Sequence, residues 1–308
     1  MTNLPKFKTI FFHPRYWLTW LGILTLWCIV LLPYNFLYRI GHMLGKISMY
    51  FFTKRVNIAR KNLNLCMPSM TDKEREIMLK RNFESVGMGI IETSMAWFWP
   101  DWRIKKWFTI TGYENIKKVH QSDRGILLIG IHFLTLELGA RILGLLNPGI
   151  GVYRPNNNKL IDWFQTKGRL RSNKKMINRY DLKGMIRALK QKEIIWYAPD
   201  HDYGAQNSVF VPFFGVSDTA TTAGSYILIK STHPAVISFI PKRKSHGKGY
   251  ELIILPDFSN ELVIIKNKEI MITKINKFIE NAVMKAPEQY MWLHRRFKTR
   301  PPGYPSIY

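Results

Sequence analysis

Cysteine is scarce in this sequence, and its scarcity excludes several kinds of site. The 308 residues contain two cysteines, Cys28 and Cys66, which are far apart. Two distant thiols give neither a disulfide framework nor the paired spacing of a cysteine-ligated zinc site. The sequence also lacks a Gly-x-Ser-x-Gly elbow. No motif therefore supports a serine or cysteine nucleophile.

Acidic residues are also few. The chain has 21 Asp and Glu against 46 Lys and Arg, a formal net charge of +25, and its first 71 residues contain no acid at all. A surface of this sign attracts an anionic membrane leaflet, an acidic protein, a phosphorylated lipid or nucleic acid. We expect no nucleic-acid partner, because the sequence has no zinc-finger or RNP-like motif.

Charge of either sign is absent from one long segment near the N-terminus. No charged residue occurs in 16–38, and 17–32 is almost entirely apolar. Residues 1–40 are therefore predicted to form a membrane-anchor helix, because such a helix would approach the thickness of the hydrocarbon core. Pro33 leaves a shallow or re-entrant anchor as an alternative, and a buried core helix is another. Because more basic residues follow the segment than precede it, the body, 41–308, is expected on the cytoplasmic side.

Short β-rich runs alternate with helical patterns through the body. The runs are Gly125–Ile131, Ile194–Ala198, Val236–Ile240 and Leu252–Leu255. A capping-box pattern that starts at Thr71 predicts a helix over residues 70–87. The alternation predicts an α/β fold with a mixed central sheet flanked by helices.

The segment GIHFLTLELG places His132 and Glu137 directly after an apolar strand pattern. On one continuous helix, residues five positions apart point about 140° away from each other. If His132 lies in a turn and Glu137 in the next helix, the carboxylate can orient the imidazole, whose other nitrogen then accepts a proton. Simple packing is the alternative. The same spacing recurs at His246 and Glu251, but in a polar KSHGKG turn that predicts a surface position.

Longer segments carry a resemblance to a known family. They are FFHPRYWLTWLG, NFESVGMG, ETSMAWFWPD, GILLIGIHFLTLELGAR, GIGVYRPNNN, GRLRSNKKM, WYAPDHDYG and APEQYMWLHRRFKTRP. The chain resembles the late acyltransferases of lipid A biosynthesis, in particular the members that transfer lauroyl from acyl carrier protein to a Kdo-bearing lipid IVA precursor. The resemblance implies a glycerolipid-acyltransferase-like fold, a bacterial inner-membrane location, and no cofactor besides the acyl-carrier-protein substrate.

The resemblance also implies roles for individual residues. His132 and Glu137 occupy the family's H-x-x-x-x-[D/E] positions, as general base and orienting carboxylate. Arg154, Arg169 and Arg171 match arginines expected to bind anionic groups of the lipid or the thioester oxygen, although surface salt bridges would also explain them.

The segment WYAPDHDYG contains a further cluster of polar residues at the end of a strand pattern. α/β enzymes commonly place their chemistry at such a position, and the resemblance implies a structural or substrate-positioning role for Asp200, with a plain turn as the alternative. Two other functions stay open. Its carboxylates and histidine, together with His132 and Glu137, suit a metal-dependent lipid hydrolase, but no usual ligand spacing occurs and we expect no metal. The third candidate is a noncatalytic binder of anionic membranes.

Overall fold

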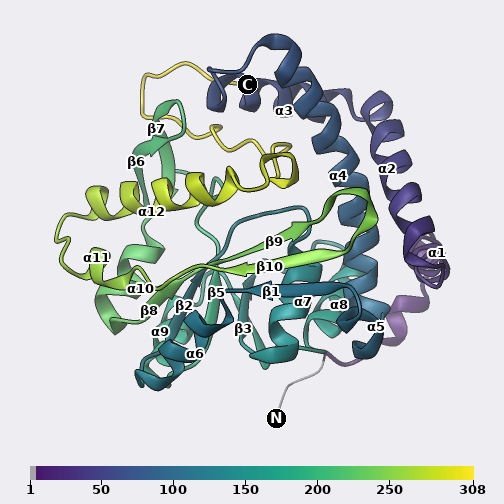
Figure 1. The fold of residues 1–308 in the computed structure, drawn as a ribbon, viewed down its shortest axis with the longest axis horizontal. Coiled ribbons are helices and arrows are strands. Elements are labelled where there is room, and N and C mark those ends of the chain that lie inside the picture. The colour runs from purple at the N-terminus through teal and green to yellow at the C-terminus, as the bar shows by residue number, and fades with distance from the viewer. Residues whose placement is uncertain (1–4) are drawn as a thin grey trace.

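The computed structural model describes residues 5–308 (Figure 1). The helices are α1 (Trp17–Ile29), α2 (Tyr34–Phe51), α3 (Thr53–Cys66), α4 (Asp72–Phe98), α5 (Asp101–Lys105), α6 (Tyr113–Gln121), α7 (Leu136–Leu146), α8 (Lys159–Arg169), α9 (Leu182–Lys190), α10 (Gly224–Thr232), α11 (Ser259–Val263) and α12 (Lys268–Val283). The strands are β1 (Phe108–Thr111), β2 (Ile126–Ile129), β3 (Ile150–Tyr153), β4 (Lys175–Asn178), β5 (Ile194–Tyr197), β6 (Ser208–Phe213), β7 (Val216–Thr222), β8 (Ala235–Ile237), β9 (Phe239–Arg243) and β10 (Tyr250–Ile254). Short 3₁₀ turns occupy Thr9–Phe12, Pro14–Tyr16, Ser245–Gly247 and Pro287–Gln289.

The strands form one large parallel sheet and two smaller sheets. The large sheet has the order β4-β3-β5-β2-β8, and all its pairs are parallel. In the second sheet, β10 pairs with β1 in parallel and with β9 antiparallel, while β6 and β7 form a hairpin. The predicted α/β class is confirmed, but the mixed pairing belongs to the smaller sheet rather than to the central one.

One predicted strand, Val236–Ile240, is wrong as a single element. The chain passes from β8 in the large sheet to β9 in the second sheet at Ser238. This serine is fully buried, and its hydroxyl donates a hydrogen bond to the Ile129 carbonyl oxygen at 2.6 Å. Continuous apolar sequence does not reveal such a change of sheet, because both halves are equally buried.

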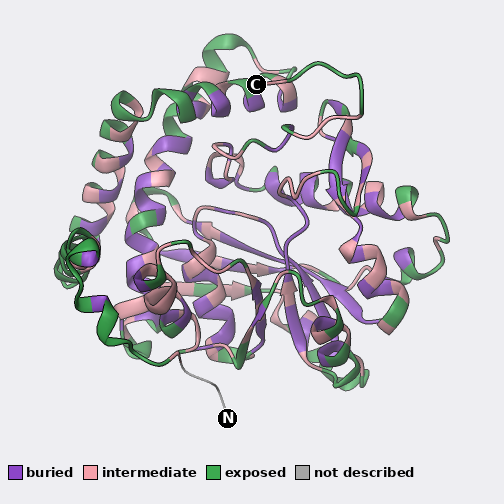
Figure 2. Cartoon of the chain, turned by 180° about the vertical axis from the view of Figure 1, so that it is seen from behind, coloured by how far each residue is buried: buried purple, intermediate pink, exposed green. Residues whose placement is uncertain are grey.

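Both faces of the large sheet are covered by helices (Figure 2). Along β2, Leu127 and Ile129 pack with residues of α9 and α10, while Ile126 and Leu128 pack with residues of α6 and α7. Two covered faces explain why β2 is apolar at every position instead of alternating with polar residues.

The long helix α4 supports the edge of the molecule that carries α1 and α2. It begins with the predicted capping box, in which the Thr71 side chain accepts from the Glu74 backbone and Glu74 bonds back to Thr71. Helices α2 and α4 pack closely at glycines: a Cβ atom on Gly87 would lie 2.1 Å from the Gly41 carbonyl oxygen. This close approach fixes α2 along α4.

The predicted membrane-anchor helix is interrupted. Helix α1 has 13 residues, about 20 Å at helical rise, and α2 starts after Pro33 and runs through residue 40. Trp99 and Arg103 donate hydrogen bonds to the Val30 carbonyl oxygen at 2.7 and 3.0 Å and so satisfy the end of α1. Across residues 5–308 no helix combines the length and apolarity needed to cross a bilayer, so the prediction that residues 1–40 form one membrane-anchor helix is wrong.

Candidate active site

The sheet order brings two loops together at the carboxyl edge of the parallel strands. Strands β2 and β5 are neighbours, with Ile129 opposite Tyr197 in their register. His132 follows β2, and Asp200 follows β5. Residues that leave adjacent parallel strands at their carboxyl ends lie side by side, which is where α/β enzymes commonly place their chemistry.

His132 is held by Asp200 through two hydrogen bonds. The His132 backbone N–H donates to Asp200 Oδ2 at 2.8 Å, and His132 Nδ1 lies 2.6 Å from Asp200 Oδ1. Because an ionised carboxylate only accepts hydrogen bonds, Nδ1 carries a proton, and in the neutral ring the lone pair is then on Nε2. Nε2 has no hydrogen-bond partner within the described residues, and the side chain is 19% exposed, so a substrate can reach it.

Asp200 is fully buried, and burial alone would raise its pKa. The interaction with His132, which hydrogen-bonds to the carboxylate through both its ring and its backbone N–H, outweighs burial and holds the pKa of Asp200 well below its usual range. The carboxylate therefore stays ionised at neutral pH and can stabilise an imidazolium that forms on His132.

Glu137 lies in the first turn of α7, as predicted, but it does not contact His132. It pairs instead with Arg169 at the end of α8, whose Nε lies 3.1 Å from both carboxylate oxygens and whose Nη2 also binds Oε1. Burial would raise the pKa of Glu137, and the Arg169 guanidinium outweighs it and lowers that pKa. The predicted contact of Glu137 with the imidazole is wrong, because Asp200 already occupies Nδ1.

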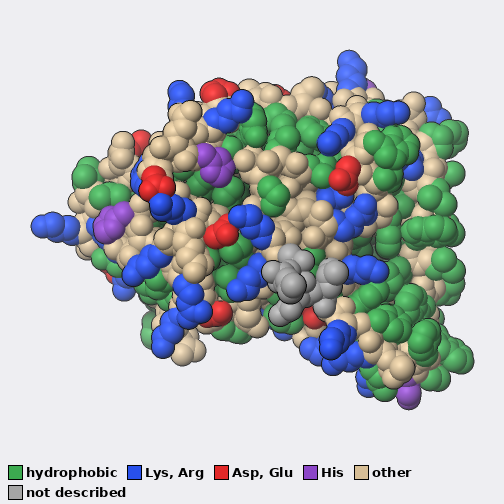
Figure 3. Space-filling view, turned by 90° about the horizontal axis from the view of Figure 1, so that it is seen from below, with side chains coloured by type: hydrophobic (Ala, Val, Ile, Leu, Met, Phe, Trp, Pro, Cys, Tyr) green, Lys and Arg blue, Asp and Glu red, His purple; other side chains and the backbone are tan. Residues whose placement is uncertain are grey.

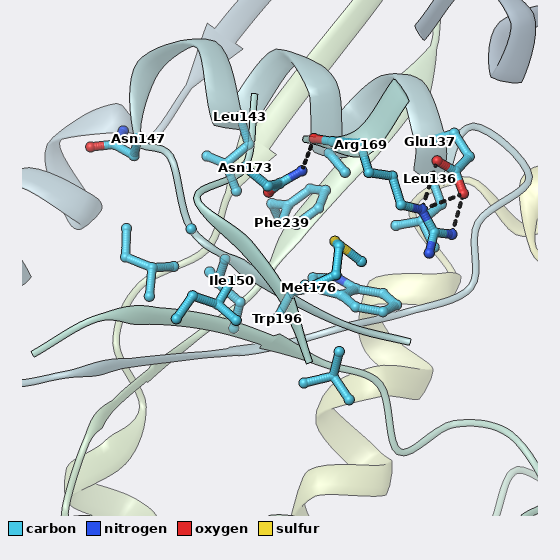
Figure 4. A pocket seen from close by; sticks show the side chains of 17 residues that line it. Leu136, Glu137, Leu143, Asn147, Ile150, Arg169, Asn173, Met176, Trp196 and Phe239 are labelled. Carbon is cyan, nitrogen blue, oxygen red and sulfur yellow. Dashed lines mark hydrogen bonds and ion pairs between the residues drawn. The ribbon is translucent and has the colours of Figure 1, made fainter. Parts of the chain in front are cut away.

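The Glu137–Arg169 ion pair stands at one end of a mostly apolar cavity (Figure 4). The lining includes Leu128, Leu143, Gly149, Ile150, Val152, Met176, Ile194, Trp196 and Phe239, and Asn147 lies at the other end. Trp196 connects the cavity to His132, because the centres of the two rings lie 5.9 Å apart in an edge-to-face arrangement. A Cβ atom on Gly130 would lie 2.4 Å from the indole ring, so glycine there lets Trp196 approach.

Comparison with known proteins identifies the family. The model of the bacterial lipid A biosynthesis acyltransferases matches residues 4–299. The chain belongs to this family. It is 58% identical over 308 residues, the full length of both chains, to the lipid A biosynthesis lauroyltransferase of Escherichia coli (strain K12).

Two further relatives match over almost their whole length. A lipid A biosynthesis acyltransferase of Haemophilus influenzae is 53% identical over 312 residues, which cover 99% of this chain and 98% of that protein. The lipid A biosynthesis palmitoleoyltransferase of E. coli is 47% identical over 303 residues, 98% of each chain. The chain is thus a lipid A biosynthesis acyltransferase, and the hydrolase and the noncatalytic binder are set aside.

The potential metal-ligand atoms beside His132 are not arranged to bind one ion. His132, Asp200 and His201 place one potential ligand atom each within 4.8 Å of one another. The two imidazole rings, however, are stacked 3.4 Å apart with planes 11° from parallel. Lone pairs lie in the ring planes, so those of nearly parallel rings do not converge on one ion, and Asp200 is already hydrogen-bonded to His132.

The remaining predicted arginines are not in contact with His132. Arg154 follows β3 at the same edge of the sheet, is exposed, and lies 3.4 Å from the Asn157 side-chain oxygen. Arg171 is also exposed and donates to the Trp97 carbonyl oxygen. His246 lies in the turn between β9 and β10, as expected of a surface position. Of the three arginines, only Arg169 is joined to another predicted site residue.

Sequence reasoning missed His294 beside the site and considered His201 only as a possible metal ligand. His201 stacks on His132, and His294 stacks on His201 with ring centres 3.9 Å apart. Both occur in segments that carry the family resemblance, WYAPDHDYG and YMWLHRRFK, but no spacing within the sequence joins positions 132, 201 and 294.

Proposed function

We propose that the protein transfers a lauroyl group from acyl carrier protein to the hydroxyl of a hydroxyacyl chain on a Kdo-bearing lipid IVA precursor. The observation that carries this proposal is His132, oriented by Asp200 at Nδ1 and accessible at Nε2, beside an apolar cavity. The relative with 58% identity is named a lauroyltransferase, which favours lauroyl as the donor chain.

The chemistry follows from the tautomer of His132. Neutral Nε2 removes the proton of the acceptor hydroxyl as its oxygen attacks the thioester carbonyl carbon. Asp200 stabilises the imidazolium that results. When the tetrahedral intermediate collapses, the carbon–sulfur bond breaks, the ester remains on the lipid, and the imidazolium returns its proton to the departing thiolate. The reaction needs neither a covalent enzyme intermediate nor a cofactor.

The Glu137–Arg169 pair serves this reaction as the polar end of the acyl cavity. Because each side chain neutralises the other, the pair can stand at the mouth of an apolar site without an uncompensated buried charge. In this proposal Glu137 fixes Arg169, and Arg169 presents its remaining guanidinium surface to the thioester or to the lipid. Arg154 and Arg171 contribute positive charge for anionic lipid groups.

The cavity between α7 and the large sheet is lined mostly by apolar side chains and therefore suits the acyl chain of the donor. Each methylene moved from water into such a site contributes about 0.8 kcal/mol, so a long chain is bound mainly by burial. Asn147 lies at the end of the cavity opposite the ion pair, where it would limit the chain length (Figure 4).

A membrane surface is the proposed location. Exposed apolar side chains gather on the N-terminal helices and turns, along the edge of the molecule seen at the right of Figure 3. They include Phe12, Trp17, Leu18, Leu21, Leu24, Trp27, Leu31, Phe36, Met43, Ile47, Tyr50 and Phe51. An apolar face of this extent on a charged protein is typical of a monotopic contact with the bilayer. We place it on the cytoplasmic side of the bacterial inner membrane, where acyl carrier protein is available.

Mass spectrometry of the lipid product tests the function. Purified protein in detergent is given the lipid precursor and a panel of acyl-acyl carrier proteins, with a chelator present. We expect the lipid to gain one acyl group, with lauroyl transferred fastest. His246→Ala is the matched control and should leave the product unchanged. Absence of product, or activity that chelation abolishes and zinc or manganese restores, would contradict the proposal.

A further inference from the structure

Three imidazole rings form a continuous stack behind the candidate base. His132 and His201 have ring centres 3.4 Å apart and planes 11° from parallel, and His201 and His294 follow at 3.9 Å and 14°. The three histidines come from three distant segments: the loop after β2, the loop after β5, and the segment after the 3₁₀ turn Pro287–Gln289. Such an arrangement requires tertiary structure to hold each ring in place.

Hydrogen bonds fix both ends of the stack. At one end His132 Nδ1 is bound to Asp200. At the other end His294 Nε2 accepts a hydrogen bond from the Asp202 backbone N–H at 3.1 Å. The Asp202 carboxylate in turn accepts from the Thr299 backbone and hydroxyl at 2.7 and 2.9 Å, which ties this loop to the C-terminal segment. The middle ring, His201, has a buried Nε2 with no hydrogen-bond partner in the described chain, so stacking is its main contact there.

The rings of His201 and His294 are neutral at physiological pH. Burial, and after it the neighbouring His132, lower the pKa values of His201 and His294. The buried guanidinium of Arg296 also disfavours their protonation, while Asp200 favours it. Neutral rings add no positive charge on the face of His132, so they do not oppose the imidazolium that forms there during proton transfer.

The stack fixes the plane of the His132 imidazole, which Asp200 alone does not fix. A hydrogen bond at Nδ1 fixes the direction in which that nitrogen points, but the imidazole can still swing about the bond. The face of His201 on one side and the Trp196 ring, which is nearly perpendicular to the imidazole, remove this freedom. The ring plane, and with it the direction of the Nε2 lone pair, then has one value.

We infer that His201 and His294 are positioning residues, whose stacked rings fix the plane of the His132 imidazole so that Nε2 faces the acceptor hydroxyl. The inference rests on the proposed function, in which His132 is the base, and adds that the histidine after Asp200 is required for its shape rather than for its protons. Misplacement of a reacting group by about 1 Å can cost on the order of 10²-fold in rate.

The test compares a variant that removes the ring with one that keeps it. His201→Ala should lower kcat on the order of 10²-fold and leave KM for lipid and for acyl-acyl carrier protein unchanged. His201→Phe keeps a flat ring without a titrating nitrogen and should restore most of the loss. Equal loss in both variants, a change confined to KM, or normal kcat in a folded His201→Ala protein would overturn the inference.

A second readout does not depend on turnover. In protein carrying ¹³C-labelled histidine, His132 is identified among the eight histidines by the signal missing from His132→Ala. Its ring protons should be shifted by the ring current of His201, lose that shift in His201→Ala, and regain it in His201→Phe. Unshifted wild-type signals would contradict the stack itself. A wild-type protein with the shifted signals but no acyl transfer would instead contradict the proposed function, so the two failures are distinguishable.

Discussion

Replacement of Asp200 by asparagine should prevent His132 from acting as a base while the protein remains folded. Asparagine has nearly the same size as aspartate but offers one carbonyl oxygen where the carboxylate offers two. If that oxygen keeps the His132 backbone N–H, now 2.8 Å from Oδ2, the amide NH₂ faces His132 Nδ1. Nδ1 must then accept a hydrogen bond, and the proton moves to Nε2. In that tautomer the nitrogen that faces the substrate cannot take a proton.

The loss of rate follows from this change of tautomer. In serine proteases the corresponding exchange lowers kcat by about 10⁴-fold, which is equivalent to about 5.5 kcal/mol of transition-state stabilisation. We expect Asp200→Asn to lower kcat by about 10³–10⁴-fold with KM nearly unchanged, since Asp200 is buried and does not face the substrate.

The assay is the initial rate of lipid acylation at saturating concentrations of both substrates, followed by mass spectrometry. Asp123→Asn is the matched control, because Asp123 is an exposed aspartate that pairs with Lys192 and has no part in the site. It should retain most of the activity. Thermal melting shows whether each variant is folded. A folded Asp200→Asn protein whose kcat stays within about tenfold of the wild type would refute the assigned role of Asp200.

Four further predictions concern the cavity, the ion pair, pH and the carrier protein. A Cβ atom on Gly151 would lie 2.8 Å from Met176 Cε. Gly151→Val should therefore shift donor preference to shorter chains, by about 0.8 kcal/mol per excluded methylene, and an unchanged preference across the donor panel would place the acyl chain elsewhere. In a double-mutant cycle, Glu137→Ala and Arg169→Ala should be coupled by about 0.5–3 kcal/mol in free energy of unfolding, because the two side chains form an ion pair. The effects of Glu137→Ala and His132→Ala should be additive. The opposite pattern would indicate a direct contact between His132 and Glu137. Burial lowers the pKa of His294 from 6.5 to about 4, so the unfolded chain takes up this proton first. The contribution of neutral His294 to the free energy of unfolding is complete above pH 6.5 and is lost towards pH 4, by up to roughly 3 kcal/mol. His294→Phe should flatten the dependence of this free energy on pH over that range. An unaltered slope would exclude His294 as its source. The affinity for acyl carrier protein should weaken as salt rises, because exposed charges are screened within about 8 Å at physiological ionic strength; an affinity independent of salt would contradict electrostatic docking.

Local patterns in the sequence predict local structure well. The capping box at Thr71 and Glu74 marks the start of α4 correctly, because its two hydrogen bonds involve residues three apart. His132 lies in a loop and Glu137 in the following helix, as the change from strand to helix pattern predicts. Pro33 also indicates the break between α1 and α2, since proline cannot donate the hydrogen bond that a continuous helix needs.

Contacts between distant segments could not be predicted in the same way. The partner of His132 is 68 positions away, and only the adjacency of β2 and β5 in the sheet brings the two together. A glutamate five residues along was the nearer candidate, but Arg169 at the end of α8 engages it. The histidine stack depends on a third segment, near residue 294, whose position is set by Asp202 and Thr299. Motif spacing contains no information on these tertiary contacts.

Single-turnover acyl transfer by His132→Ala tests most directly whether His132 is the general base. Enzyme in excess over lauroyl-acyl carrier protein and lipid precursor separates the chemical step from substrate binding and product release. We predict that the lipid still binds, while transfer slows by at least about 10²-fold, the usual contribution of a positioned general base. Transfer by a folded His132→Ala protein at the wild-type rate would show that another group removes the hydroxyl proton.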